Sequence, residues 1–314
     1  MTITVEGNYP KLQHVETGLH SLDHALAKGA TLGMPLRVIT EIYGNTHVGK
    51  STLTYFLAGK VRPAGTILLC DFEGMDIEHL PVAMLPSGFD GTVKLIEAMD
   101  AKGKMKSHED MLRELSVSYA EMPDINAGII DSIGAIAPIF ELEGGIEEGM
   151  GAKRATIVSR FIRRVLISVL GRDLPSNLFV TNHSHSLIMS QGHTSSGGVT
   201  LHGLSATRLY LYPKTADNIK SSDDVLAHCV GGTAEKLRYG GKGGQFKFFI
   251  IPGHGVRPNL TAIQDCVDLK LADRGSVLKI GDKSFGYISK AVQEDLDGND
   301  DFFKPFFEAL KAHG

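Results

Sequence analysis

The sequence predicts an α/β fold, with a mostly parallel sheet covered by helices on both faces. Three apolar runs, at residues 66–71, 127–131 and 177–182, end in acidic or polar residues and are separated by helix-like segments. Strands that are apolar along their whole length are buried on both faces, as in a parallel sheet between two helix layers. A glycine-rich loop at 44–51 also joins a strand-like run, 36–43, to a helix-like run, 52–61. A ligand is therefore expected at the carboxyl ends of these strands.

The composition indicates one large soluble core. The chain has 314 residues, of which 42% are hydrophobic and 22% charged, and it contains no 18-residue apolar run and no secretory leader. Membrane insertion and secretion are therefore not expected, and a cytoplasmic location is. Cys70, Cys229 and Cys266 lie far apart without CxxC spacing, which predicts neither a zinc site nor a disulfide framework. The formal net charge of −4 excludes an indiscriminate polycation but not a local basic groove.

The remaining elements divide the chain into three parts. Residues 1–15 are predicted to be an N-terminal arm or edge strand. The core, 16–272, begins with a helix at 17–26, with Ser21 as its N-cap and Gly29 as its stop, and ends after an outer strand at 245–251. A charged surface helix is expected within 101–121. Residues 273–314 are predicted to form a small C-terminal α/β extension or subdomain, which ends in a helix at 302–312.

The loop at 44–51 has the pattern GxxxxGKS, which is typical of nucleoside triphosphate binding. Its glycines let the backbone curl with N–H groups inward, and Lys50 reaches the β- and γ-phosphates. The Ser51 hydroxyl is a ligand for Mg²⁺, and the following helix directs its positive end at the phosphates. The predicted nucleotide contacts are Gly44, Asn45, Thr46, His47, Val48, Gly49, Lys50, Ser51 and Thr52.

Three strand ends carry candidate catalytic groups. Asp131 is placed to hold Mg²⁺, usually through a water, beside Ser51. Glu73, just beyond the strand at 66–71, is placed to accept a proton from the attacking water. Asp71 is an alternative candidate for this role, and a third interpretation is that both acids only cap the next turn. His183 ends another strand, where a polar side chain can detect the γ-phosphate.

Two loops beside basic residues are candidates for a nucleic-acid groove. One is a long stretch rich in Ser, Gly and His at 184–199, and the other is a glycine-rich stretch at 143–151. A basic helix follows the second loop, and Ile146 and Met189 are candidates to wedge between bases. On the pattern alone, surface loops and a solvated basic helix face are an equally good interpretation.

Several motifs together resemble the RecA family of recombinases, and most closely its phage UvsX-type members. The resemblance covers residues 17–296, and its motifs occur in the family's order. They are Thr17–Asp23, Glu41–Gly44, Asp71–Glu73, Ile130–Pro138, Glu143-Gly144, Met150-Gly151, Asn182-His183, and Gly197–Leu201 through Arg208.

The resemblance implies a RecA-like P-loop NTPase core at 16–272 that binds ATP and Mg²⁺ and hydrolyses ATP in response to DNA. It implies that Glu73 activates water and that His183 is the γ-phosphate sensor, a position where RecA proper has glutamine and UvsX-type proteins have histidine. Lys236 and Arg238 match cations that reach the neighbouring subunit's γ-phosphate. Asp76, with His79, is placed at the nucleotide base.

The resemblance also places the two loops on the family's DNA-binding loops. The implied DNA contacts are Ile146, Gly149, Met150, Lys153, Arg154, Arg160, Leu187, Ile188, Met189, Gly197 and Gly198. Three departures stand out. The chain has no long N-terminal helical domain and no acidic tail, and His202-Gly203 stands where RecA has a Lys-Phe pair that relays ATP binding across the interface.

The expected function is that of an ATP-dependent recombinase, which forms a filament on single-stranded DNA and exchanges strands with homologous duplex DNA. Its expected partners are both DNA forms, further copies of itself, and single-strand-binding and loading proteins. Two alternatives remain: a hexameric helicase-type ATPase of the same fold, and a single-strand annealing or accessory protein with a regulatory ATP site.

Overall fold

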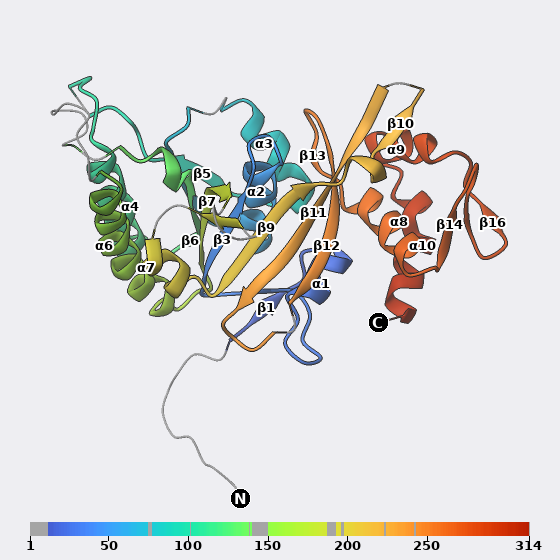
Figure 1. Ribbon diagram of the computed structural model, residues 1–314, viewed down its shortest axis with the longest axis horizontal. Coiled ribbons are helices and arrows are strands. Elements are labelled where there is room, and N and C mark those ends of the chain that lie inside the picture. The colour runs from blue at the N-terminus through green and yellow to red at the C-terminus, as the bar shows by residue number, and fades with distance from the viewer. Residues whose placement is uncertain are drawn as a thin grey trace, which may run out of the picture.

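The computed structural model describes residues 12–74, 77–100, 102–137, 139, 150–186, 193–195, 198–222, 224–241 and 243–313. Its centre is one large sheet with the strand order β13-β12-β11-β9-β3-β7-β6-β4-β5 (Figure 1). From β9 to β5 the neighbouring strands are parallel, and β11, β12 and β13 are added antiparallel. The predicted α/β fold with a mostly parallel sheet is confirmed.

The strands of this sheet include those that the apolar runs predicted. They are β3 (Ile39–Gly44), β4 (Thr66–Asp71), β5 (Thr92–Leu95), β6 (Ile125–Asp131), β7 (Asn177–Ser186), β9 (Thr207–Pro213), β11 (Asp224–Leu237), β12 (Gly244–Ile251) and β13 (Gly255–Val256), with β8 (His193–Ser195) paired to β7 and β10 (Ile219–Ser221) to β11. Outside it lie β1 (His14–Val15), β2 (Met34–Pro35), β14 (Ala272–Arg274), β15 (Leu278–Ile280) and β16 (Lys283–Ser284).

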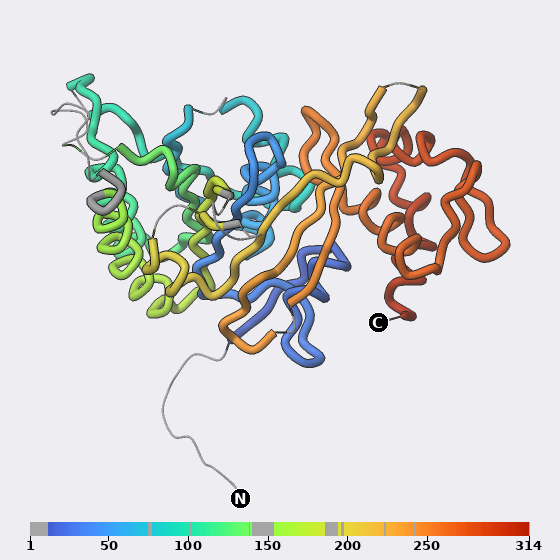
Figure 2. The backbone as a smooth tube through the Cα atoms, in the orientation of Figure 1, coloured from blue at the N-terminus to red at the C-terminus, as the bar shows by residue number. Residues whose placement is uncertain are grey.

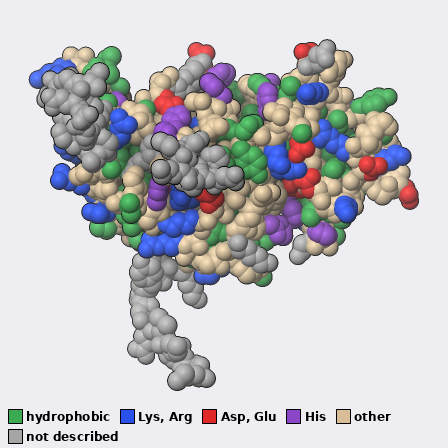
Figure 3. Space-filling view, in the orientation of Figure 1, with side chains coloured by type: hydrophobic (Ala, Val, Ile, Leu, Met, Phe, Trp, Pro, Cys, Tyr) green, Lys and Arg blue, Asp and Glu red, His purple; other side chains and the backbone are tan. Residues whose placement is uncertain are grey.

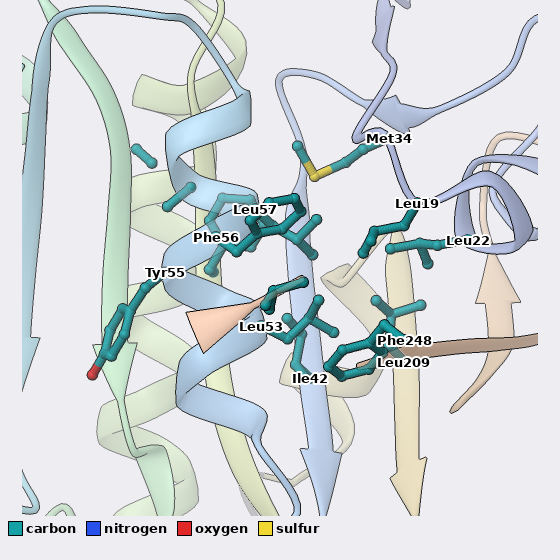
Figure 4. Close-up of a cluster of buried hydrophobic side chains, with 14 of the residues drawn as sticks. Leu19, Leu22, Met34, Ile42, Leu53, Tyr55, Phe56, Leu57, Leu209 and Phe248 are labelled. Carbon is teal, nitrogen blue, oxygen red and sulfur yellow. The ribbon is translucent and has the colours of Figure 1, made fainter. Parts of the chain in front are cut away.

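Helices cover both faces of the sheet because side chains alternate along each strand. The described helices are α1 (His20–Ala25), α2 (Lys50–Lys60), α3 (His79–Met84), α4 (His108–Glu121), α6 (Met150–Leu170), α7 (Gly198–Leu204), α8 (Pro258–Asp268), α9 (Ile288–Leu296) and α10 (Asp300–His313). In β4, Leu69 packs into a core with α2, whereas Leu68 faces the opposite core with α4 and α6. Figure 4 shows the first core, where Leu53 of α2 lies beside Ile42 of β3.

A third apolar cluster lies in the C-terminal part. Phe303, Phe306 and Leu310 of α10 pack with Phe249 of β12 and Ile263 of α8. The chain end therefore lies beside the antiparallel side of the sheet, as the tube in Figure 2 shows. Residues 272–284 form the small antiparallel sheet β14-β15-β16 next to these helices.

The charged helix expected within 101–121 is present as α4, which begins at His108, where the Ser107 hydroxyl accepts the Asp110 N–H. Two other local expectations were wrong in detail. Leu19, not Ser21, is the N-cap of α1, and the Ser21 hydroxyl instead donates to the carbonyl of Lys247. The stretch 184–199 is not one long loop, because β7 continues to Ser186, β8 pairs back onto it, and α7 begins at Gly198.

Cys70, Cys229 and Cys266 are free and buried. Among the described residues, no helix is both long enough and apolar enough to cross a membrane.

Candidate functional site

The phosphate loop is fixed between β3 and α2 by two close backbone approaches. Gly49 has φ +87°, and a Cβ there would lie 2.4 Å from Cδ1 of Ile250 on β12. A Cβ on Gly44 would lie 2.4 Å from the carbonyl oxygen of Leu211 on β9. Gly49 is required by its positive φ and Gly44 by its close approach to a backbone carbonyl, so both glycines of the pattern have a steric cause.

The loop borders a cavity of about 630 Å³ at the carboxyl end of β3. Residues 46–52 form one wall, Glu73 and His183 lie beside it, and Val230 and Ile250 of the antiparallel strands close the other side. No described side chain caps the N-terminus of α2, so its backbone N–H groups face this cavity for an anion. The structure thus brings the predicted loop residues, Glu73 and His183 together.

Lys50 lies inside the curve of the loop. Its Nζ donates to the carbonyl of Asn45 at 2.9 Å, and the residue is 8% exposed. Burial lowers the pKa of the Lys50 ammonium, against the opposing pull of Glu73 and Asp131. A buried ammonium beside uncapped N–H groups fits the β- and γ-phosphates of a nucleotide.

Asp131 is held rigidly at the end of β6. Its Oδ2 accepts the Tyr55 hydroxyl at 2.7 Å, and its Oδ1 accepts the hydroxyl of Thr181. Each carboxylate oxygen has more than one lone pair, so both can still accept from waters of a bound cation. Among the residues that the structure describes, no three His, Cys, Asp or Glu side chains form a metal cluster. A single carboxylate, Asp131, near the hydroxyl-bearing phosphate loop suits Mg²⁺, which uses few carboxylates together with waters and phosphates.

Glu73 and His183 meet at the mouth of the cavity. Glu73 Oε1 lies 3.0 Å from Nε2 of His183 and also accepts from the Ser132 hydroxyl. Desolvation acts to raise the pKa of Glu73, but these hydrogen bonds together with His183 and Lys50 hold it below its usual value. Glu73 is therefore ionised and can accept a proton. Asp71 accepts the backbone N–H groups of Glu73 and Gly74, which is the turn-capping role.

Lys236 and Arg238 lie at the opposite end of the sheet. Val230 of β11 lines the cavity beside the phosphate loop, and Lys236 is six residues further along the same strand, about 20 Å away at the usual rise per residue. Lys236 pairs in register with Arg208 near the start of β9. Arg238 is exposed. Neither cation reaches the cavity of its own protomer.

The residues predicted to bind DNA and those predicted to lie at the nucleotide base are only partly described. Asp76, Ile146, Gly149, Leu187, Ile188, Met189 and Gly197 lie outside the described residues. Met150 and Lys153 belong to the first turn of α6. Arg160 is exposed on α6, Arg154 donates to the carbonyl of Gly134, and Gly198 begins α7 with φ +74°. His79 begins α3 and lines a smaller cavity beside Ser51 and Tyr55.

Basic side chains gather on the α4 and α6 side of the molecule (Figure 3). The exposed ones are Arg113 of α4 and Arg160, Arg163 and Arg164 of α6. Ile157, Phe161 and Val165 face the other way, into the core. The predicted amphipathic basic helix is therefore present.

Sequence reasoning missed a largely buried polar cluster beside β3. Its members are Glu41, Asn182, Ser195, His202 and Arg208. Glu41 is fully buried in β3 and forms an ion pair with Arg208 at 2.7 Å. The signal in the sequence was a single acid inside an otherwise apolar strand, since a buried carboxylate requires a partner.

The comparisons with known proteins agree with this architecture. The RecA N-terminal domain family matches residues 2–235. Protein RecA of Caulobacter vibrioides is 24% identical over 96% of this chain and 81% of its own length. Protein RecA of Deinococcus radiodurans is 25% identical over 88% of this chain and 73% of its own length. Protein RecA of Ruegeria pomeroyi is 25% identical over 100% of this chain and 87% of its own length. Because the family model matches residues 2–235, which is most of the chain, the chain belongs to the RecA family.

Proposed function

We propose that this protein is an ATP-dependent DNA recombinase, which assembles on single-stranded DNA and pairs it with homologous duplex. The observation that carries the proposal is the position of its charged groups. The nucleotide cavity with Lys50, Glu73 and His183 lies at one end of the sheet, and Lys236 and Arg238 lie at the other. Each protomer therefore offers one half of an ATP site at each end, and head-to-tail stacking completes the sites.

In this proposal, ATP binds between protomers. Lys50 and the N–H groups of α2 bind its phosphates, Glu73 takes the proton of the attacking water, and His183 detects the γ-phosphate. Mg²⁺, held by Ser51 and through water by Asp131, would neutralise charge on the phosphates. Lys236 and Arg238 of the next protomer place fixed positive charge where the transition state becomes negative.

DNA binding is assigned to residues around 143–151 and 184–199 and to the basic side chains of α6. Phosphate neutralisation by Arg154, Arg160 and Lys153 would make the affinity fall steeply with salt. His183 at the sensor position supports a phage UvsX-type subtype, active in the cytoplasm of the infected host. We also propose residues 1–15 as an inter-subunit arm, 16–272 as the ATPase core and 273–314 as a C-terminal extension. Single-strand-binding and loading proteins remain proposed partners.

Strand exchange between a labelled duplex and a homologous single strand tests the proposal. We expect displaced strand only with ATP and only with a homologous substrate, and Lys50→Ala is the matched inactive control. A protein that anneals complementary single strands but never displaces one would instead be an annealing or accessory protein. Electron microscopy with DNA and ATP separates open filaments from the closed rings of a helicase-type ATPase.

A further inference from the structure

A chain of hydrogen bonds crosses the protomer from the nucleotide cavity to Lys236. At the cavity end, the backbone N–H of His183 donates to the side chain of Asn182 at 2.9 Å. The amide nitrogen of Asn182 donates in turn to Oε1 of Glu41 at 3.0 Å. The Asn182 side chain thus connects Glu41 to the backbone of His183, the proposed sensor.

The Ser195 hydroxyl joins Glu41 to His202. It donates to Glu41 Oε1 at 2.5 Å and lies 2.8 Å from Nε2 of His202, while Nη2 of Arg208 donates to it at 3.1 Å. A hydroxyl has one hydrogen, and the buried carboxylate is its stronger acceptor. We therefore assign the hydrogen of the second contact to Nε2 of His202. Ser195 is 6% exposed, so these contacts exclude water.

At the far end, the backbone of His202 holds Lys236. The ammonium of Lys236 donates to the carbonyl of His202 and to that of Gly203, the latter at 2.9 Å. Both carbonyls belong to the last turn of α7, where they have no acceptor role within the helix. The place of the ammonium is therefore set by the place of the α7 end, and the His202 side chain ties that end to Ser195.

We propose that Ser195 and His202 are positioning residues, which fix the end of α7 so that Lys236 is presented to the nucleotide of the neighbouring protomer. This inference rests on the proposed function, because it requires Lys236 to act in trans. Without the Ser195 hydroxyl, Asn182 and Arg208 keep their own bonds to Glu41. The variant Ser195→Ala should therefore damage the neighbour's site and spare its own.

Mixing two variants tests this direction of action. In Glu73→Gln, the protomer's own site lacks its base, but its Lys236 is intact. In Ser195→Ala, the base is intact but Lys236 is misplaced. An equal mixture should contain about one quarter of interfaces with both good halves, by random head-to-tail stacking. DNA-stimulated ATP turnover should therefore exceed the mean of the two separate variants.

A mixture of Glu73→Gln and Lys236→Ala is the matched control. Its gain in activity requires only that Lys236 of one protomer completes the site of its neighbour, and it does not depend on Ser195. If that control gains no activity, the proposed function fails, and this inference with it. If the control gains activity and the Ser195→Ala mixture does not, Ser195 acts within its own protomer and the inference alone is overturned. Success of both mixtures supports it.

Single variants add a second readout. Ser195→Ala alone should lower kcat roughly tenfold with an unchanged KM for ATP, because a hydrogen bond in a charged cluster is lost outside the binding site. Ser195→Thr keeps the hydroxyl and should restore kcat. Should Ser195→Ala fail to fold, His202→Ala takes its place in the mixture, with His202→Gln as the variant that retains a donor. A fall in ATP affinity instead of kcat would contradict the assigned role.

Discussion

Nε2 of His183 lies 3.0 Å from Oε1 of Glu73, although one residue belongs to β7 and the other follows β4, with β6 between the two strands. The pair joins the proposed sensor to the proposed base. A γ-phosphate that attracts the imidazole would change the surroundings of the carboxylate at the same time. Under the proposed roles, this one contact would link the nucleotide state to the basicity of Glu73.

Replacement of the base should stop chemistry and spare binding. Glu73→Gln keeps the size of the side chain but cannot accept a proton, so we expect ATP turnover to fall roughly 100-fold or more. Nucleotide affinity, measured by fluorescence titration, should change little. Asp71→Asn is the control, because Asp71 caps the turn at Glu73 and Gly74. A larger loss in Asp71→Asn than in Glu73→Gln would assign the base to Asp71.

Removal of the loop ammonium should abolish hydrolysis. Lys50→Ala takes away the charge that lies inside the loop, and we expect a loss of at least about 100-fold in turnover. Lys60→Ala, at the other end of α2, controls for the loss of a partly buried lysine from that helix. Retained turnover in Lys50→Ala would remove the loop from its assigned role.

The two cations at the far end of β11 should act only between protomers. Lys236→Ala combined with Arg238→Ala should leave ATP binding near normal and suppress DNA-stimulated turnover on the order of 1,000-fold. The unstimulated rate of dilute protein provides the internal reference. Stimulated rates equal to those of the unchanged protein would exclude completion of the site in trans.

Stability should fall as the pH rises through the range where Asp265 ionises. Burial raises the pKa of this carboxyl to about 7, against the opposing bond from Ser21, so the folded state binds a proton that the unfolded state releases near pH 4. The free energy of unfolding should therefore decrease on the order of 4 kcal/mol between about pH 4 and pH 8 from this group. Asp265→Asn should flatten that slope in urea titrations.

Asp23 contributes in the same direction, because burial raises its pKa to about 6 against bonds from Thr17 and Gly18. A residual slope in Asp265→Asn is therefore expected. Asp90→Asn, at an exposed position, should leave the profile unchanged. If the dependence of unfolding free energy on pH were the same in Asp265→Asn, the pKa of the Asp265 carboxyl would not be raised in the folded state.

The sequence predicted the parts of the fold whose cause is local. The phosphate loop needs Gly49 at positive φ, and the apolar strand 66–71 needs burial on both faces, so each pattern is readable from a few adjacent residues. The strands β9 and β11 were not predicted. In β11, Gly231 and Gly232 lie under the rings of Tyr212 and Phe246, so glycines that weaken a strand pattern are there for clearance.

The polar cluster around Glu41 could not be predicted from the sequence for a different reason. Glu41 and Arg208 are 167 positions apart, and no local pattern states which buried acid meets which cation. The polar end of β7, residues 184–186, carries no apolar alternation, so its sequence predicts a loop. Pairing with β8 turns it into a strand, and that pairing depends on tertiary context.

The separation of the phosphate loop from Lys236 makes every protomer directional. Under the proposed function, an open row of protomers always leaves one terminal nucleotide without a neighbour's cations. The fraction of incomplete sites is therefore larger in a short row than in a long one. The rate of ATP turnover per protomer should increase with the length of the assembly and then reach a plateau.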